Sequence, residues 1–298
     1  MNTLIIGSSG KIGNFFLKSK KKNFFFTYFK TKIRNGIKFN IAKDSISVII
    51  NRYKIKKIVF LSAITNPDDC EKNKIYSNNI NIIMTKKIIN EVIKKNIYFL
   101  FISSEFIFSG KKGDYNENDK AKPINLYGKQ KLLIEKFLKE NYKNFSILRI
   151  AKTYSDNMKD KTLITSYINE IFSRKKIFFA SKKQIFSPLY VKDLIKIIYF
   201  FLSKKKVGLF HVAGPKSYSR FQILIKILNK INKDRKNKFL PKIKDVNLNK
   251  LKLIAKRPLN VSLNINKLKK NINFSLKNID DILEKILKKI NEKKIKTR

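Results

Sequence analysis

A tyrosine and a lysine four positions apart, Tyr127 and Lys131, carry the side chains best suited to proton transfer in this chain. The segment 126–140 has the pattern of an amphipathic helix, in which residues at i and i+4 share one face. A lysine ammonium beside a phenol favours the phenolate, so we expect a pKa for Tyr127 below its usual value of about 10. Such a phenol can pass a proton to a carbonyl oxygen while hydride reaches the carbon.

The Tyr–Lys spacing is a weak signal by itself, because 68 residues are Lys or Arg and such pairs arise by chance. A hydroxyl at a strand end strengthens it. The apolar segment 98–102 is followed by Ser103 and Ser104, and ligands of open α/β sheets bind beyond the carboxyl ends of the strands. We therefore expect Ser104 to polarise the same carbonyl oxygen.

Glycines at 7, 10 and 13 mark a nucleotide-binding turn. The chain has nine glycines, and three stand here in a G-x-x-G-x-x-G spacing between a strand-like and a helix-like segment. Bare amide groups and a helix N-terminus at one point suit a pyrophosphate. The missing side chains at Gly7, Gly10 and Gly13 let a dinucleotide approach the backbone.

The residues after the second expected strand favour NADPH. Proteins that bind NAD carry an Asp or Glu there for the ribose 2′-hydroxyl, whereas segment 27–34 holds no acid and includes Lys30 and Lys32. Cations at this place suit a 2′-phosphate. NADPH is thus the expected cofactor, with NADH as the alternative.

Short apolar runs alternate with amphipathic segments up to residue 150. Runs of Ile, Val and Phe suit strands that are covered on both faces, and their alternation with helices predicts an α/β fold with a doubly wound parallel sheet of Rossmann type. The expected strands are 3–6, 23–29, 57–61, 98–102 and 146–150, and the expected helices are 10–19, 44–53, 78–95 and 126–140.

The pattern changes after residue 150, where helices outnumber strands. We expect a dinucleotide-binding domain over 1–150 and a smaller α/β lobe for substrate over 151–298, with parts near 180–203 packing back on the first domain. His211 is the only histidine and falls in an apolar segment, which favours a structural role. The expected helices are 162–174, 191–202, 221–232 and 279–290, and the expected strands are 177–179 and 208–212.

The net charge of +47 is spread along the chain as lysine mixed with Ile, Asn and Phe. Nucleic-acid readers gather their basic residues and use Arg at base edges, so no nucleic-acid partner is expected. The charge suits anionic ligands such as nucleotide sugars. Cys70 is the only cysteine, which excludes an internal disulfide and offers no metal site. No apolar run reaches the ~20 residues of a membrane span, and no signal peptide is expected, so the expected location is the cytoplasm.

Seven segments in order carry motifs of one known family. They are the cofactor turn 5–13, the segment 62–71, the run 102–110 that is similar to "S-S/T-D-Y-V-F-D-G", the run 123–131 that is similar to "P-x-N-x-Y-G-x-S-K", the segments 187–194 and 210–214, and the run 257–263 that is similar to "R-P-x-N-S-x-L". Nearly end to end, the chain resembles the extended short-chain dehydrogenase/reductase superfamily. Within it, the chain resembles most the dTDP-4-dehydrorhamnose reductases and their sugar-nucleotide-binding relatives.

The resemblance implies a role for each matching residue. Tyr127 is the proton donor, Lys131 is its partner and a ribose ligand, and Ser104 hydrogen-bonds the substrate carbonyl. Asn81 supports the active site through water. The implied cofactor ligands are Gly7, Gly10, Lys11, Ile12, Gly13, Ser62, Ala63, Tyr127 and Lys131.

The chain departs from the family motifs near the expected substrate. Glu105 and Phe106 stand where relatives have Asp and Tyr, which leaves the identity of the sugar open. We expect both residues at the substrate, together with Arg257 of the last motif. Asn40 stands near the place of an adenine-reading Asp and is expected at the cofactor.

The expected function is that of an NADPH-dependent reductase of a nucleotide-activated 4-keto-deoxysugar in surface polysaccharide synthesis. One alternative is an epimerase or dehydratase that retains NAD. Another is a non-catalytic NADP-binding regulatory subunit, as in one relative that partners an S-adenosylmethionine-forming enzyme. The expected partner is the nucleotide-sugar substrate, and a homodimer is left open.

Overall fold

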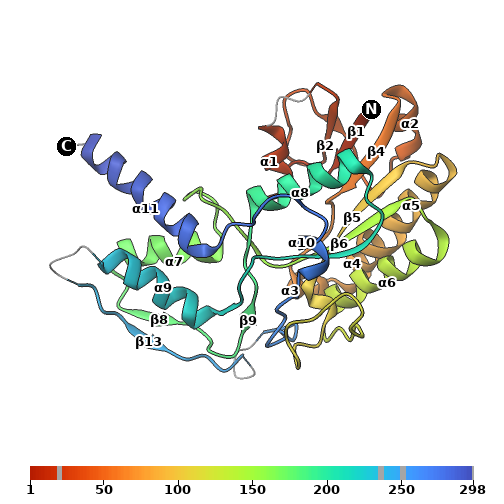
Figure 1. Ribbon diagram of the computed structural model, residues 1–298. Helices are drawn as coiled ribbons and strands as arrows, with labels where there is room; N and C mark the ends of the chain where they lie inside the picture. Colours follow the sequence, from red (N-terminus) through yellow and green to blue (C-terminus); the bar gives the residue numbers. More distant parts are fainter. Residues whose placement is uncertain (19–21, 234–237, 249–252, 297–298) are drawn as a thin grey trace.

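Seven parallel strands form the central sheet of the computed structural model, which describes residues 1–18, 22–233, 238–248 and 253–296. The strand order is β11-β6-β5-β4-β1-β2-β3, so the chain winds outward from β1 in one direction and from β4 in the other (Figure 1). This doubly wound sheet confirms the predicted fold class. The strands are β1 (Asn2–Ile6), β2 (Phe24–Tyr28), β3 (Ile37–Lys38), β4 (Ile55–Phe60), β5 (Tyr98–Ser104), β6 (Phe145–Ile150) and β11 (Gly208–Val212).

Helices cover both faces of the sheet, as strands that are apolar on both sides require. Alternate residues of β1 enter opposite clusters: Leu4 and Ile6 lie in one, and Ile5 lies in the other. One face carries α2 (Ile46–Arg52), α5 (Thr85–Lys94) and α6 (Leu126–Asn141), and the other carries α1 (Gly13–Leu17) and α8 (Val191–Lys204). The first helix begins at Gly13 rather than at residue 10, because residues 7–12 form a turn, and residue 19 of the expected helix lies outside the described residues.

The helix expected over 78–95 is divided in the structure. α3 (Pro67–Lys72) and α4 (Lys74–Asn78) lead into a π-helical turn, η1 (Asn79–Met84), which continues as α5. The hydroxyl of Thr85 donates to the carbonyl of Ile80 at 2.9 Å and so bonds within the widened turn. Turns of this kind occur mostly inside α-helices and frequently at functional sites.

A lobe beside the sheet has a buried cluster of its own, in which three helices pack together. Short strand pairs border it, and in Figure 1 the lobe lies to the left of the sheet. The helices are α7 (Leu163–Phe172), α9 (Arg220–Asn232) and α11 (Ile279–Lys296). The strand pairs are β7 (Thr153–Tyr154) with β10 (Leu189–Tyr190), β8 (Ile177–Phe179) with β13 (Lys242–Lys244), and β9 (Ile185–Phe186) with β12 (Tyr218–Ser219).

The edge strand β11 comes from the second half of the chain. Its register with β6 pairs Gly208 with Ser146 and Val212 with Ile150. A short helix, α10 (Asn266–Lys269), contacts β11 from a segment still later in the chain. The sheet therefore takes in residues beyond 150, and a division of the chain at that residue stays a prediction.

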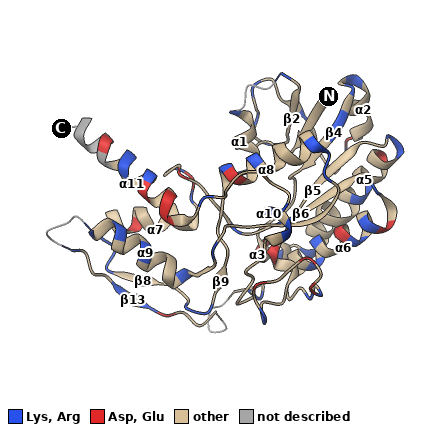
Figure 2. Cartoon of the chain, viewed as in Figure 1, with Lys and Arg blue, Asp and Glu red and all other residues tan. Residues whose placement is uncertain are grey.

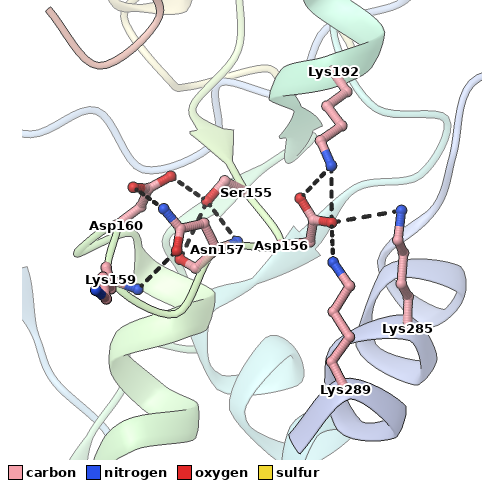
Figure 3. Close-up of polar contacts among 8 residues, drawn as sticks. All are labelled: Ser155, Asp156, Asn157, Lys159, Asp160, Lys192, Lys285 and Lys289. Atoms are coloured by element: carbon pink, nitrogen blue, oxygen red, sulfur yellow. Dashed lines mark hydrogen bonds and ion pairs between the residues drawn. The ribbon is translucent and has the colours of Figure 1, made fainter. Parts of the chain in front are cut away.

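One carboxylate ties the C-terminal helix to the rest of the molecule (Figure 3). Asp156 follows β7, and its side chain is 4% exposed. It pairs with Lys192 of α8 at 2.9 Å, with Lys289 of α11 at 3.1 Å and with Lys285 of α11 at 3.5 Å. Burial opposes the charge, but hydrogen bonds from Lys192 and Lys289 hold the pKa of Asp156 below its ordinary value.

Lys and Arg occur on elements of both the sheet and the lobe (Figure 2). Within the described ranges, no helix combines the length and the apolar character that crossing a bilayer needs. The same residues contain no group of three His, Cys, Asp or Glu side chains that could hold a metal ion.

Candidate functional site

The glycine turn lies where the winding of the sheet changes direction. β1 and β4 are neighbours, and open α/β sheets bind ligands at such a switch point. Gly7 follows β1 with a φ of 89°, and a Cβ there would lie 2.9 Å from the backbone nitrogen of Ser62 in the loop after β4. Ala63 is the next residue of that loop. The structure thus brings together Gly7 and Ser62, two predicted cofactor residues that are far apart in the sequence.

Gly13 closes the turn at short range. A Cβ on Gly13 would lie 2.5 Å from the Gly7 carbonyl oxygen, whereas one on Gly10 would lie 3.3 Å from it. Lys11 is exposed, and Ile12 packs against the sheet core. A tight turn that excludes side chains at its contacts leaves backbone surface for a phosphate to approach. These residues therefore fit a dinucleotide.

The other predicted cofactor residues follow β2 and β3. Lys30 and Lys32 come after β2 and are exposed. Asn40 comes after β3, where its Oδ1 accepts the N–H of Ala42 at 3.0 Å and shapes the local turn. Because parallel strands end at one edge of the sheet, all three residues lie on the side of Gly7.

A side-chain cap fixes Tyr127 at the start of α6. Asn125 accepts the N–H of Gly128 at 2.9 Å and donates to the carbonyl of Lys256 at 3.0 Å. Such a cap satisfies a backbone donor that the helix start leaves without a partner. Ser104, the last residue of β5, lies close to Tyr127, and its hydroxyl acts to lower the pKa of the phenol. The predicted pair therefore meets at the carboxyl end of β5.

Lys131 is buried one turn further along α6. Its Nζ donates to the carbonyl of Ile102 at 2.9 Å and lies 5.9 Å from the centre of the Tyr127 ring. Burial lowers the pKa of Lys131 to about 8, although the carboxylate of Glu135 acts in the opposite direction. The amine is thus fixed behind the phenol by its bond to β5.

The expected low pKa of Tyr127 is wrong in this structure. Burial raises the pKa of the phenol, the hydroxyl of Ser104 opposes this rise only in part, and Glu105 raises the pKa further. Lys131 does not reverse the shift because its ammonium is directed to the carbonyl of Ile102. The phenol is therefore protonated at neutral pH, which is the form that a proton donor requires.

Asn81, in the π-helical turn, connects two parts of the site. Its Oδ1 accepts the N–H of Ile64 at 2.9 Å in the loop after β4, and its Nδ2 donates to Gln130 of α6 at 2.7 Å. Gln130 stands between Tyr127 and Lys131 in the sequence and is absent from the predicted site. Gln130 stands where the quoted motif has Ser, which marks the position in the sequence, but its contact depends on the turn that carries Asn81. The water-mediated role of Asn81 stays a prediction.

Glu105 and Phe106 lie beside the reacting pair in a short 3₁₀ helix, η2 (Glu105–Ile107). The Phe106 ring meets the Tyr127 ring edge-on with centroids 6.3 Å apart. The carboxyl of Glu105 is buried and accepts the N–H of Lys152 at 3.2 Å. Burial raises the pKa of Glu105 to about 8. Both departures from the family motif thus adjoin Tyr127.

Arg257 is held by an acid that the sequence prediction does not include. Its Nη2 donates to Asp68 of α3 at 2.6 Å, and the other oxygen of Asp68 accepts the N–H of Ala255 at 2.9 Å. The pair attaches the segment around Arg257 to the loop that carries Ser62. The expected contact of Arg257 with substrate stays a prediction.

A buried ion pair supports the sheet next to the site. Glu135 of α6 and Arg149 of β6 approach to 2.7 Å with side chains 1% and 3% exposed. Ser103 donates to Glu135 at 2.5 Å, and Arg149 donates to Nε2 of His211 at 3.3 Å. Nδ1 of His211 therefore carries the hydrogen and donates to the carbonyl of Tyr115 at 2.9 Å. His211 is fully buried and has a structural role.

Two further cations lie near Glu105 and are absent from the predicted site. Lys152 follows β6, and Arg220 opens α9 on the lobe. Because lysine is abundant throughout the chain, the sequence does not distinguish Lys152 from the other lysines. Strand register is the only available signal, because Ile150 of β6 pairs with Ser104 of β5, so that Lys152 follows β6 close to Ser104.

The site thus has a serine beside a buried tyrosine, a buried lysine behind that tyrosine, and a glycine turn that fits a dinucleotide. This combination defines the class of NAD(P)-dependent oxidoreductases known as extended short-chain dehydrogenases/reductases. Comparison with known families specifies the member. Residues 1–292 match the model described as "RmlD substrate binding domain", and the chain belongs to that family.

The similar proteins are described either as a methionine adenosyltransferase subunit or as dTDP-4-dehydrorhamnose reductases. Methionine adenosyltransferase 2 subunit beta of Pongo abelii is 27% identical over 235 residues, which cover 76% of this chain and 68% of that protein. A solved structure described as a hypothetical dTDP-4-dehydrorhamnose reductase from Sulfolobus tokodaii has a TM-score of 0.82 at 29% identity, with 95% and 98% of the two chains covered. The dTDP-4-dehydrorhamnose reductase of Bacillus anthracis, solved in complex with NADP, has a TM-score of 0.80 at 22% identity and covers 97% and 100%.

Proposed function

We propose that this protein is an NADPH-dependent reductase of a nucleotide-activated 4-keto-deoxysugar. The observation that carries the proposal is the proximity of Ser104, the last residue of β5, to the buried phenol of Tyr127, with the amine of Lys131 buried behind the Tyr127 ring. A hydroxyl and a proton donor at one point suit a substrate carbonyl. The adjacent glycine turn suits the coenzyme.

The bound coenzyme supplies a hydride to the keto carbon. Tyr127 donates its proton to the oxygen as negative charge develops there, and Ser104 holds that oxygen with a hydrogen bond. The ammonium of Lys131 lies behind the phenol and stabilises the phenolate that remains. Asn81 acts through Gln130 as a positioning residue for α6.

NADPH is the proposed coenzyme because Lys30 and Lys32 follow β2 where an NAD protein has an acid. Gly7, Gly10 and Gly13 would hold the pyrophosphate, with Ser62 and Ala63 beside it. The Bacillus anthracis structure in complex with NADP supports this choice. We further propose that residues 1–150 mainly bind the coenzyme, that 151–298 mainly bind the sugar, and that the product enters surface polysaccharide synthesis.

A substrate screen tests the proposal. Purified protein is incubated with NADPH and with dTDP-, UDP-, GDP- or CDP-linked 4-keto sugars, and the loss of NADPH absorbance is followed. We expect net oxidation of NADPH with at least one of these sugars. Protein that retains NAD during purification and interconverts sugars without net oxidation would instead be an epimerase or dehydratase.

A second candidate is a regulatory subunit without turnover. The likeness to methionine adenosyltransferase 2 subunit beta supports it. This candidate predicts a stable complex with the catalytic subunit of a methionine adenosyltransferase and no oxidation of NADPH. Size-exclusion chromatography of a mixture of the two proteins, beside the substrate screen, separates the two candidates.

A further inference from the structure

The carboxyl of Glu105 is buried beside the proposed catalytic pair, and one of its two oxygens has no hydrogen-bond partner among the described residues. The residue is 4% exposed. Its Oε1 accepts the N–H of Lys152 at 3.2 Å, whereas its Oε2 is buried and has no hydrogen-bond partner among the residues that the structure describes. Buried polar atoms are nearly always hydrogen-bonded, so this exception points to a group that is supplied from outside the chain. Glu105 acts electrostatically on the phenol of Tyr127, so its carboxyl lies near the proposed catalytic pair.

Two cations stand next to this carboxyl. Lys152 is solvent-exposed at the end of β6, and Arg220 approaches from the lobe. Both act electrostatically on Glu105. The guanidinium of Arg220 lies near the phenol of Tyr167, and its Nε is buried without a hydrogen-bond partner in the described part of the chain. Lys152 and Arg220 can therefore each donate a further hydrogen bond.

Positive charge in this group exceeds negative charge. Arg220 and Arg257 act on the Lys152 ammonium as like charges, and Glu105 acts in the opposite direction. Arg257 is paired with Asp68, but within the described residues neither Lys152 nor Arg220 has an ion-pair partner. Cations that are crowded together without a counter-ion favour an anionic ligand.

We propose that Lys152 and Arg220 bind a carboxylate on the sugar of the substrate, and that the unused oxygen of Glu105 hydrogen-bonds the same group. The inference rests on the proposed reductase function. It narrows the substrate to a nucleotide-activated keto sugar that carries a carboxylate at one carbon and lacks a hydroxyl at a different carbon. Glu105 can donate this bond, because with a pKa of about 8 its carboxyl is protonated at neutral pH. Lys152 and Arg220 supply charge-assisted hydrogen bonds.

The place of the cluster favours the sugar over the diphosphate. In a 4-keto hexose the diphosphate is attached at C-1, across the ring from the carbonyl carbon. A carboxylate at C-6 is only two bonds from that carbon. Since Glu105 acts electrostatically on Tyr127, the proposed proton donor, the cluster is placed for a group on the carbonyl side of the ring.

Matched pairs of nucleotide sugars test the inference. Calorimetric titration of the NADP-saturated protein compares UDP-glucose with UDP-glucuronic acid, and dTDP-glucose with dTDP-glucuronic acid. We expect the acid of at least one pair to bind about tenfold more tightly than its neutral partner. Lys152→Gln and Arg220→Gln should each remove this preference, and the exposed Lys216→Gln should keep it. The NADPH affinity and melting temperature of each variant report whether it is folded.

The outcomes separate the two proposals. If no nucleotide sugar binds, the proposed function fails and the inference fails with it. If the neutral and acidic members of a pair bind the wild-type protein equally, the inference alone is overturned. It is also overturned if the variants weaken both members equally, because the cations would then serve the diphosphate.

Discussion

At the scale of single residues, burial decides how the site works. Tyr127 and Lys131 have the spacing of a phenolate pair, but the structure separates the ammonium from the phenolic oxygen and buries both groups. The pKa of Tyr127 rises for that reason. Reduction of a ketone consumes a proton, so a protonated phenol suits reduction better than the phenolate that the spacing predicts.

Replacement of Tyr127 by Phe removes the proton donor and keeps the ring. We expect kcat to fall by about 10²–10⁴-fold, while the dissociation constant for NADPH changes little. Steady-state kinetics and a fluorescence titration with NADPH measure the two quantities. The matched control is Tyr142→Phe, which removes the hydroxyl that donates to Ile97 outside the site at 2.6 Å. Activity that survives in Tyr127→Phe would exclude this residue from the mechanism.

His211 makes stability depend on pH. Burial and the nearby Arg149 lower its pKa to about 3, against about 6.5 in an unfolded chain. Between these values the unfolded state binds a proton that the folded state does not, so the free energy of unfolding falls as the pH falls. The slope approaches about 1.4 kcal/mol per pH unit below pH 6.5.

Urea denaturation at pH 7 and pH 5 measures this slope. We expect His211→Asn to be less stable at pH 7, because the bond to Tyr115 is altered, and to lose much less stability between the two pH values than the wild-type protein. Equal slopes in the two proteins would show that other groups cause the acid sensitivity.

At the scale of elements, the glycine turn gives a matched pair of substitutions. A Cβ at position 13 would lie 2.5 Å from the Gly7 carbonyl oxygen, and one at position 10 would lie 3.3 Å from it. We expect Gly13→Ala to cost about 1–3 kcal/mol of stability and to weaken NADPH binding strongly. Gly10→Ala should change stability much less. Urea unfolding and NADPH titration of both variants check the order, and equal stability losses would contradict it.

Asp156 gives a prediction for the C-terminal helix. Asp156→Asn removes the carboxylate and leaves Lys192, Lys285 and Lys289 to repel one another. We expect faster amide hydrogen exchange in α11 and a loss of about 1 kcal/mol. Glu170→Gln, which breaks the exposed pair with Lys175, is the control and should leave exchange in α11 unchanged.

Elements that depend on the local sequence pattern could be predicted. Elements that depend on contacts with residues far along the chain could not. Continuous apolar runs locate the sheet strands, because a strand that is buried on both faces needs apolar residues at successive positions. The two-residue strands β7 and β10 depend on each other across the lobe and have no local signal. The π-helical turn at Asn81 reads as ordinary helix, and Lys152 and Arg220 meet Glu105 only through tertiary packing. The motif order, in contrast, predicts Ser104, Tyr127 and Lys131 as one group, and the structure places them together at the end of β5.

At the scale of the whole molecule, the charge of +47 opposes folding through self-repulsion. Screening shortens the reach of these charges from about 30 Å at 0.01 M salt to about 8 Å at 0.15 M. We expect the melting temperature to rise over this range of sodium chloride. Sodium sulfate at equal ionic strength is the control. A rise with sulfate alone would indicate bound anions rather than screening.

β11 is synthesised after the other six strands of the sheet, and this order affects the chain during protein synthesis. A ribosome delivers the first six strands of the sheet well before residues 208–212 emerge, and in that interval β6 has an open edge of backbone donors and acceptors. Pairing between nascent chains through this edge is therefore a hazard until β11 covers it.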